Sequence, residues 1–521
     1  MDITSSNSLW KDYDVAALPL NESALSGKIE NGITVREYYF DGYTTVDGRV
    51  RAFIKIYENA GDKGTILYMG GTNGEYGSEF ISSFCERGYT VAVLDYLGKT
   101  ESLAHYTLYP KSLEHCNSRG AEKFEITDDA LHSRWYIWTC LARRAAYLLK
   151  TKYGGKLFAV GEGLGGTSVY KLAAFDDGIS ACATLLNIIP AVSGEGNGMI
   201  NYHASLENYA YASVCKVPMY MAVASNAEDG SLDDMSELAG DTASLKCFRV
   251  IERAFSCGIG AVFGELDSFF TTQYDRPIIK PVIKASNSEG NLYFNITLGK
   301  DEADENHYDL DLYVAFCIDI PQYRNWMKLK TIGLGDTFMA NINVCQADKP
   351  IYAFANVKTG DGMIISTPIL SVLPKSLGIA GRAGVSHRRI YEGSMGMDGW
   401  IARRNGKLAL VKGPYDIDGI TSDNGSLITF KPGDPLFRVP ADTLLQLMLS
   451  GKPQTITVTV SDKQNSYSCQ VEITNTEDWH NFSLSHMNFK SANGPLFDWS
   501  QILILELTSD ENFVIGSVLW V

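Results

Sequence analysis

The residues that most suggest chemistry lie in a glycine-dense turn at 161–166, with the sequence GEGLGG. The turn follows a short apolar run, 157–160, that predicts a buried strand, and it precedes the predicted start of a helix at 167–174. Strand, sharp turn and helix form the setting of the G-x-S-x-G motif, whose central serine is a nucleophile for acyl transfer. Here the central residue is Gly163, which has no side chain that could attack. The motif therefore predicts a turn without predicting its reaction.

Acyl transfer at such a turn also needs a base, a carboxylate that orients the base, and two backbone N–H groups for the oxyanion. The N–H donors would be Leu164 and either Gly71 or Thr72, which follow a strand predicted at 65–69. The carboxylate is expected after a strand predicted at 218–224, where Glu228 and Asp229 are the candidates. A turn explains Asp229 equally well.

A histidine base is expected after a strand predicted at 246–251, but residues 252–258 read ERAFSCG, and the sequence has no histidine between His203 and His307. Three other side chains are candidates for a catalytic role. Glu162 adjoins the central glycine and could position a water molecule, Ser168 lies one turn into the helix, and His105 lies in a long connection. For Ser168 we expect packing, and for His105 an anchoring role at the surface.

The composition excludes several classes of partner. Across 521 residues, 45 basic and 61 acidic side chains leave a formal net charge of −16, which argues against nucleic acid and anionic membranes. No apolar run approaches the length of a membrane span, and the first 15 residues lack the basic and apolar regions of a signal peptide. We therefore expect a soluble, cytoplasmic protein, although a trimmed leader would leave the same sequence and the native compartment stays open.

Metals and cofactors are not expected. The ten cysteines form no C-x-x-C pair and the eight histidines form no H-x-x-x-H pair, so the spacing of a transition-metal site is missing. We expect the cysteines to be mostly buried free thiols, as in a reducing compartment. The oligomeric state is left open.

The length predicts several domains. In residues 1–273, apolar strands alternate with helical patterns, which predicts an α/β domain with a mostly parallel sheet covered on both faces. Residues 274–376 contain short strands between polar turns, typical of an immunoglobulin- or fibronectin-like β-sandwich. Residues 377–521 are again all-β and predict a jelly roll.

The turn, the strand followed by Gly70-Gly71, and the order strand, helix, strand, long insertion, helix, turn make the first 270 residues resemble the α/β-hydrolase fold. Within it they look most like acyl-hydrolases of the acetyl-xylan-esterase and dienelactone-hydrolase type. Segments 479–484, 496–502 and 515–521 resemble the last strands of galactose-binding-like jelly rolls, which are common as carbohydrate-binding domains. Trp400 and Trp479 are accordingly candidates to stack on sugar rings.

These observations favour a catalytically degenerate α/β-hydrolase-like protein, a pseudoenzyme that binds a carbohydrate or acylated glycan or acts as a scaffold. Two alternatives remain. One is an active carboxylic-ester hydrolase, acting on acylated glycans or small esters with a non-standard catalytic set. The other is a purely structural multidomain protein.

Overall fold

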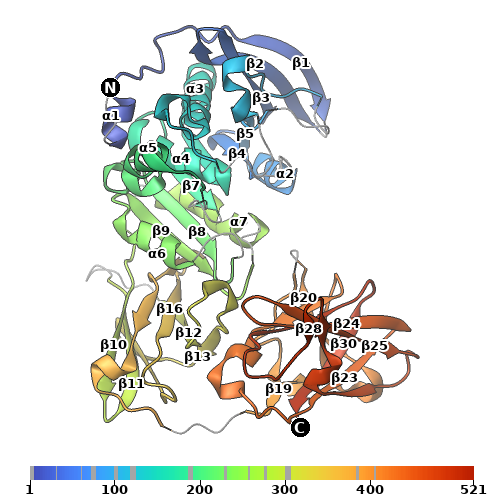
Figure 1. The fold of residues 1–521 in the computed structure, drawn as a ribbon. Coiled ribbons are helices and arrows are strands. Elements are labelled where there is room, and N and C mark those ends of the chain that lie inside the picture. The colour runs from blue at the N-terminus through green and yellow to red at the C-terminus, as the bar shows by residue number, and fades with distance from the viewer. Residues whose placement is uncertain are drawn as a thin grey trace.

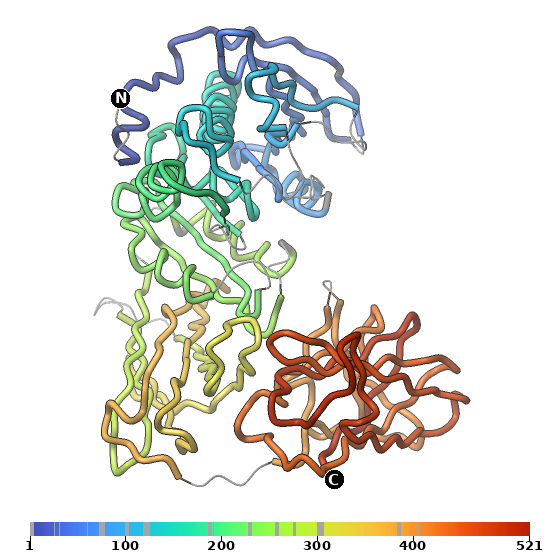
Figure 2. The backbone as a smooth tube through the Cα atoms, viewed as in Figure 1, coloured from blue at the N-terminus to red at the C-terminus, as the bar shows by residue number. Residues whose placement is uncertain are grey.

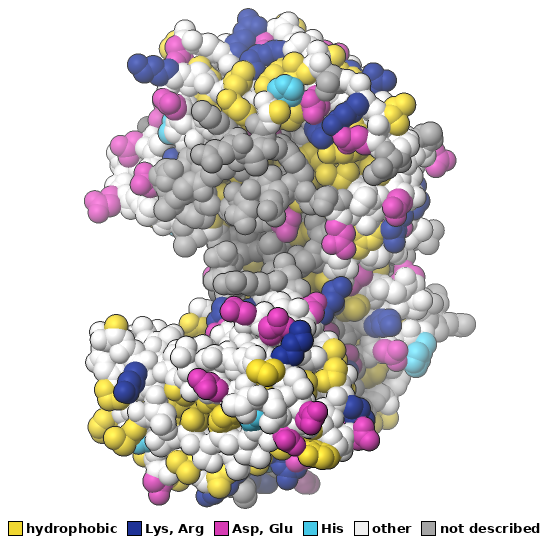
Figure 3. Space-filling view, turned by 90° about the vertical axis from the view of Figure 1, so that its right-hand side faces the viewer, with side chains coloured by type: hydrophobic (Ala, Val, Ile, Leu, Met, Phe, Trp, Pro, Cys, Tyr) yellow, Lys and Arg dark blue, Asp and Glu magenta, His cyan; other side chains and the backbone are white. Residues whose placement is uncertain are grey.

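The computed structural model describes the chain except for residues 1–4, 31, 60, 72–77, 99–103, 118–124, 186–189, 191, 228–231, 256–258, 275–277, 300–306, 383–386 and 404–405. Three sheet-built regions follow one another along the chain (Figure 1), and the third lies beside the second (Figure 2). We call them the first, second and third regions. Seen from the side of the third region, the molecule is hollowed between that region and the first (Figure 3).

The first region is built on a nine-stranded sheet with the order β1-β2-β3-β5-β4-β6-β7-β8-β9. The strands are β1 (Ser23–Glu30), β2 (Ile33–Thr45), β3 (Gly48–Glu58), β4 (Gly64–Met69), β5 (Tyr89–Asp95), β6 (Leu157–Glu162), β7 (Ala181–Leu185), β8 (Met219–Ala224) and β9 (Leu245–Ile251). The first three are antiparallel to their neighbours, and the six from β5 to β9 in the sheet order are parallel. The predicted mostly parallel sheet is confirmed, and an antiparallel β2–β3 hairpin extends it at one side.

Helices cover both faces of this sheet. Successive side chains of a strand point to opposite faces, so Leu67 and Met69 join one apolar cluster while Ile66 and Tyr68 join the other. The first cluster is covered by α3 (Arg134–Tyr153), α4 (Leu164–Phe175) and α6 (Leu232–Asp241), and the second by α2 (Ser78–Glu86) and α7 (Ile259–Ser268). The chain leaves β4 toward β5 and returns on its other side as β6, so a topological switch point lies between β4 and β6.

The second region packs two antiparallel sheets against a shared apolar cluster. One contains β10 (Val282–Ser288), β11 (Asn291–Thr297), β15 (Thr337–Ile342) and β14 (Ile332–Leu334). The other contains β13 (Met327–Leu329), β12 (Asp309–Phe316), β16 (Ile351–Lys358), β17 (Ile364–Ser366) and β18 (Leu370–Val372). The arrangement is consistent with the predicted β-sandwich.

The third region again has two antiparallel sheets around one cluster. One contains β20 (Leu408–Lys412), β21 (Asp418–Ser422), β30 (Phe513–Trp520), β23 (Leu445–Gly451), β26 (His480–Leu484) and β19 (Arg389–Glu392). The other contains β22 (Ser426–Thr429), β29 (Ile504–Thr508), β24 (Gln454–Ser461), β25 (Ser466–Ile473), β27 (Lys490–Ser491) and β28 (Gly494–Pro495). This too is consistent with a β-sandwich, and its jelly-roll connectivity, its galactose-binding resemblance and the domain boundaries stay predictions.

The second region covers the β9 end of the large sheet. The backbone N–H of Val250 donates to Oγ of Ser366 on β17 over 2.7 Å, and the Cys247 thiol donates to the carbonyl of Ile364 over 3.5 Å. Met363 and Ile365 bury their side chains in a cluster of the first region. An edge strand that could otherwise pair with another chain is thereby closed.

The cysteines and the helices bear on two further predictions, free thiols and the lack of a membrane span. Nine of the ten cysteines lie in the described part of the chain, and all nine are free thiols, six of them buried. No helix in the described ranges combines the length and the apolar character needed to cross a bilayer.

Candidate functional site

The turn after β6 has the shape that the sequence predicts. Gly163 precedes α4 with φ 51° and ψ −118°, a conformation that side chains rarely adopt, and its N–H donates to Leu185 O over 2.9 Å. A Cβ on Gly161 would lie 2.6 Å from the carbonyl oxygen of Gly165, and one on Gly165 only 2.2 Å from that of Met69. Helix and strands approach so closely here that Gly161 and Gly165 must be glycine.

Gly163 differs from these two glycines because it has space around it. A Cβ on Gly163 would meet its nearest neighbour, Cα of Gly71, at 3.9 Å, an ordinary contact. The central position could therefore hold a side chain, at the cost of backbone strain alone. Gly71, Gly163 and Leu164 all lie at the switch point, where ligands bind in open α/β sheets.

Two of the three predicted oxyanion donors, Leu164 and Gly71, lie among the described residues. Leu164 is the first residue of α4, so its N–H has no acceptor within the helix. Gly71 follows β4 beside it, and a Cβ on Gly71 would lie 3.7 Å from the carbonyl oxygen of Glu162. Thr72 lies outside the described residues. The structure brings the two described donors to the same turn.

A partly buried acid–phenol pair adjoins the turn. Oη of Tyr68 donates to Oε2 of Glu162 over 2.8 Å, and the Tyr68 ring stacks on Phe80 with 4.5 Å between centroids. Burial raises the pKa of the Glu162 carboxyl, although the hydrogen bond from Tyr68 acts in the opposite direction. The same burial, with the charge of Glu162, raises the pKa of Tyr68. Glu162 therefore holds a proton more readily than an exposed glutamate.

Ser168 and His105 lie away from this pair. Ser168 is buried within α4, as expected for a packing residue. Nδ1 of His105 lies 3.0 Å from Oε2 of Glu37, and its ring lies 5.8 Å from that of Phe53. These contacts place His105 over β2 and β3, which β5 and β4 separate from β6.

The start of the loop after β8 is bound to the second region. Nδ2 of Asn226 donates to the carbonyls of Gln322 and Arg324, over 3.1 and 2.9 Å, and Trp326 donates through its ring N–H to Ser225 O over 3.3 Å. Glu228 and Asp229, the predicted carboxylates, lie outside the described residues. The described part of this loop serves to join two regions.

The loop after β9, where a base was expected, is likewise an interface. Arg253 has φ 52°, and its Nε donates to Trp326 O over 3.0 Å while its guanidinium pairs with Asp398 of the third region at 2.5 Å. The Phe255 ring packs at 5.8 Å against that of Phe430, also from the third region. Sequence reasoning missed this junction, although an arginine and a phenylalanine in a loop expected to hold a histidine were a signal of contact.

The two tryptophans proposed for sugar contact lie in different surroundings. Trp400 is only 2% exposed, edge-to-face against Tyr391 at 5.8 Å, so burial argues against the predicted stacking on a sugar. Trp479 is half-buried and donates its ring N–H to Pro414 O over 2.8 Å. A Cβ on Gly516 would lie 2.9 Å from the Trp479 ring, so part of that ring packs on the sheet.

Comparison with known proteins adds little about activity. The sequence matches no protein-family model and none of the curated proteins compared with it. Similar solved structures include acetyl xylan esterase 1 from Thermoanaerobacterium sp. JW/SL YS485 (14% identity, 53% of this chain and 97% of that chain, TM-score 0.38). Another is an acetyl xylan esterase from Paenibacillus sp. R4 (11% identity, 49% of this chain and 90% of that chain, TM-score 0.34). A third is a cold-adapted esterase from an Arctic intertidal metagenomic library (15% identity, 48% of this chain and 98% of that chain, TM-score 0.33).

The strand order and the turn at Gly163 make the first region a mixed α/β sheet with a glycine turn at its switch point, and its resemblance to the α/β-hydrolase fold stays a prediction.

Proposed function

We propose that this protein is a catalytically degenerate α/β-hydrolase-like protein whose first region serves as a scaffold for two β-sandwich regions, the third region of the chain being the one that binds a ligand. The observation that carries the proposal is the loop after β9. In an acyl-hydrolase this loop presents the imidazole base to the turn. Here Arg253 and Phe255 hold it against both β regions.

The central glycine supports the same proposal. Gly163 keeps the strained backbone of a nucleophile turn, and it has room for a side chain that the sequence does not supply. A turn with its geometry retained and its attacking atom missing is what loss of catalysis on a retained fold would leave.

Hydrolysis of p-nitrophenyl acetate by Gly163→Ser tests the proposal. We expect this variant to hydrolyse the ester no faster than the wild type, because a serine without a base is a weak nucleophile. Gly240→Ser, at an open position on α6, is the matched control. A rate for Gly163→Ser about 100-fold above both other proteins would refute the proposal, since it would require a working base.

An active ester hydrolase is the second candidate, favoured by Glu162. A half-buried carboxyl of raised pKa beside the turn is suited to general-base activation of water, which contributes roughly 10²- to 10⁴-fold in rate. This candidate predicts measurable wild-type hydrolysis that falls by about 100-fold in Glu162→Gln and less in Tyr68→Phe. Wild-type protein that hydrolyses no faster than buffer would exclude it for that ester.

For the ligand we propose a carbohydrate bound by the third region at Trp479 and Tyr415. Tyr415 is 78% exposed at φ 58°, and its hydroxyl donates to Asp478 over 2.7 Å. The preceding carbonyl, of Pro414, accepts from the Trp479 ring. A strained loop that presents an aromatic ring beside a second one is suited to the flat C–H faces of sugars.

Retention on insoluble xylan and cellulose tests the ligand. We expect wild-type protein to be retained and Tyr415→Ala to elute in the unbound fraction. Phe497→Ala, which removes an aromatic ring that is 88% exposed elsewhere in the third region, should be retained like the wild type. Failure of the wild type on these polymers and on a broad glycan array would favour a purely structural role.

A further inference from the structure

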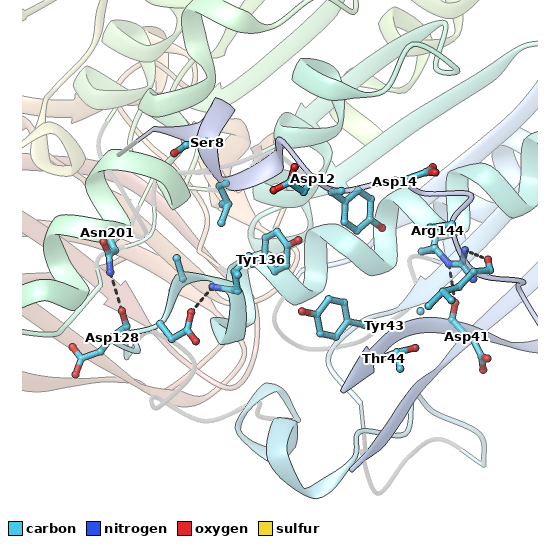
Figure 4. A pocket seen from close by; sticks show the side chains of 18 of the residues that line it. Ser8, Asp12, Asp14, Asp41, Tyr43, Thr44, Asp128, Tyr136, Arg144 and Asn201 are labelled. Carbon is cyan, nitrogen blue, oxygen red and sulfur yellow. Dashed lines mark hydrogen bonds between the residues drawn. The ribbon is translucent and has the colours of Figure 1, made fainter. Parts of the chain in front are cut away.

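A cavity of about 1110 Å³ lies away from the turn at Gly163. One wall is the N-terminal segment, 5–20, which carries α1 (Ser6–Trp10). The others come from the end of β2, from α3, from residues 128–131, and from α5 (Gly196–Asn201). Figure 4 shows Asp12 and Asp14 on the N-terminal segment, with Tyr43 and Thr44 of β2 across from them and Asp128 and Asn201 toward one end. No part of the proposed function uses this space.

The side chains that line the cavity carry mostly negative charge. Its described lining includes five aspartates and one basic residue, Arg144. Asp41 is neutralised by Arg49 and Arg51, at 2.6 and 2.5 Å, and Asp129 lies 2.6 Å from the ring of His132.

The three other aspartates are Asp12, Asp14 and Asp128. They are exposed and form no ion pair with any other described residue. An anionic ligand would therefore meet net repulsion here, whereas a cationic one would meet carboxylates on two opposite walls.

Arg144 forms no ion pair with these three carboxylates, because its donors bind backbone carbonyls, and its single positive charge leaves the lining acidic overall. Its guanidinium donates to the backbone carbonyls of Asp41, Val15, Leu18 and Pro19, over 2.7 to 2.9 Å. These bonds fasten the N-terminal segment to α3. Trp10 adds a second attachment, its ring N–H donating to Oη of Tyr211 over 2.8 Å. The wall that carries Asp12 and Asp14 is therefore held in place before any ligand arrives.

Aromatic and aliphatic side chains line the space between the carboxylates. Tyr43 and Tyr136 stand edge-to-face with 6.1 Å between ring centroids, and Tyr13 lies 6.4 Å from Tyr136 in the same geometry. The chain already places one cation on this cluster, since the Arg143 guanidinium lies 4.5 Å from the Tyr13 ring centroid. Ile200, which is 65% exposed, adds apolar surface suited to methylene groups.

We propose that this cavity binds a small aliphatic polyamine. Its ammonium groups would lie against Asp12, Asp14 and Asp128, and its methylene segments would pass over Tyr43 and Ile200. Tyrosine faces attract ammonium groups through their negative quadrupole. A volume of this size is comparable with the sites that enclose small ligands.

Titration calorimetry of the full chain with spermidine, at low ionic strength, tests the proposal. We expect saturable binding with one site per chain. Asp12→Asn combined with Asp128→Asn should weaken that binding about tenfold or more, and Tyr43→Leu severalfold. The matched control combines Asp62→Asn with Asp442→Asn, two exposed carboxylates outside the cavity. It makes the same change in net charge and should leave affinity within about twofold of the wild type.

Three outcomes would overturn the proposal. One is the absence of saturable spermidine binding. A second is equal weakening in the cavity variant and the control variant, which would mean diffuse attraction to a protein of net charge −16. The third is binding of xylotriose, lost in Tyr43→Leu, without binding of spermidine, which would identify a neutral sugar site. Thermal unfolding of each variant checks that it folds.

Discussion

Replacing the glycines of the turn one at a time measures how closely α4 approaches β4. A Cβ on Gly165 would lie 2.2 Å from the carbonyl oxygen of Met69 and 2.7 Å from that of Gly70. Normal carbon–oxygen contacts are over 1 Å longer than the first of these, and both obstacles are backbone, so no rotamer change relieves the clash. Overpacking costs typically about 1–3 kcal/mol and more where backbone must move, so we expect Gly165→Ala to destabilise the first region by about 3 kcal/mol or more.

Gly163→Ala is the internal comparison, because its Cβ meets nothing closer than 3.9 Å. Only the backbone strain at φ 51° remains. Such strain costs about 1–3 kcal/mol, less the roughly 0.4–1 kcal/mol that alanine gains from a more restricted unfolded chain.

Scanning calorimetry of both variants is the measurement. At about 2–4 °C per kcal/mol for a region of this size, Gly165→Ala should lower the transition by roughly 6–12 °C or more, and Gly163→Ala should lower it by less. A Gly165→Ala protein that unfolds at the wild-type temperature, or a larger loss in Gly163→Ala, would refute the geometry of the turn.

Three further predictions concern buried charges. Asp233→Ala should lower the free energy of unfolding by about 3 kcal/mol, because it leaves the fully buried guanidinium of Arg324 without the carboxylate that it contacts at 2.5 and 2.6 Å. Arg324→Met, which removes the buried charge itself, should cost less. Equal losses in thermal unfolding of the two variants would contradict this. Because burial raises the pKa of Glu162, the folded chain keeps a proton at pH values where the unfolded chain has released it. Stability therefore falls as pH rises from the unfolded pKa to the folded pKa of Glu162. Glu162→Gln should therefore be more stable than the wild type at neutral pH, with a difference that disappears below about pH 4 in urea titrations; a difference independent of pH would contradict it. Burial lowers the pKa of Lys171 to about 7, so the folded chain binds fewer protons than the unfolded chain up to about pH 10. Lys171→Met should therefore be more stable than the wild type at neutral pH, and this difference in unfolding free energy should shrink as pH rises toward 10. A difference that grows with pH would contradict the prediction.

The large sheet could be predicted from sequence because its signals are local. The apolar runs, the glycine pair after β4 and the glycines of the turn each reflect contacts within a few residues or with an adjacent strand. Gly161 and Gly165 illustrate this, since the close approach that requires them is encoded by the residue type itself.

The junction between the regions could not be predicted in the same way. Arg253 finds Trp326 and Asp398, which are 73 and 145 residues further along the chain, so no window of sequence contains the interaction. Trp400 shows the related limit for single residues. Its type suits both a core and a sugar site, and only the surrounding sheets decide that it is enclosed.

The β9–β17 contact bears on how freely the parts of this protein can be exchanged. Met363 and Ile365 complete an apolar cluster of the first region from outside its own stretch of chain. A gene fragment ending near residue 273 would encode a sheet whose edge strand β9 is uncovered and whose apolar cluster is exposed beside it. Its product would tend to self-associate. The α/β portion is thus not a free-standing module that evolution or an engineer could transplant alone, and its smallest transferable unit includes the neighbouring sandwich.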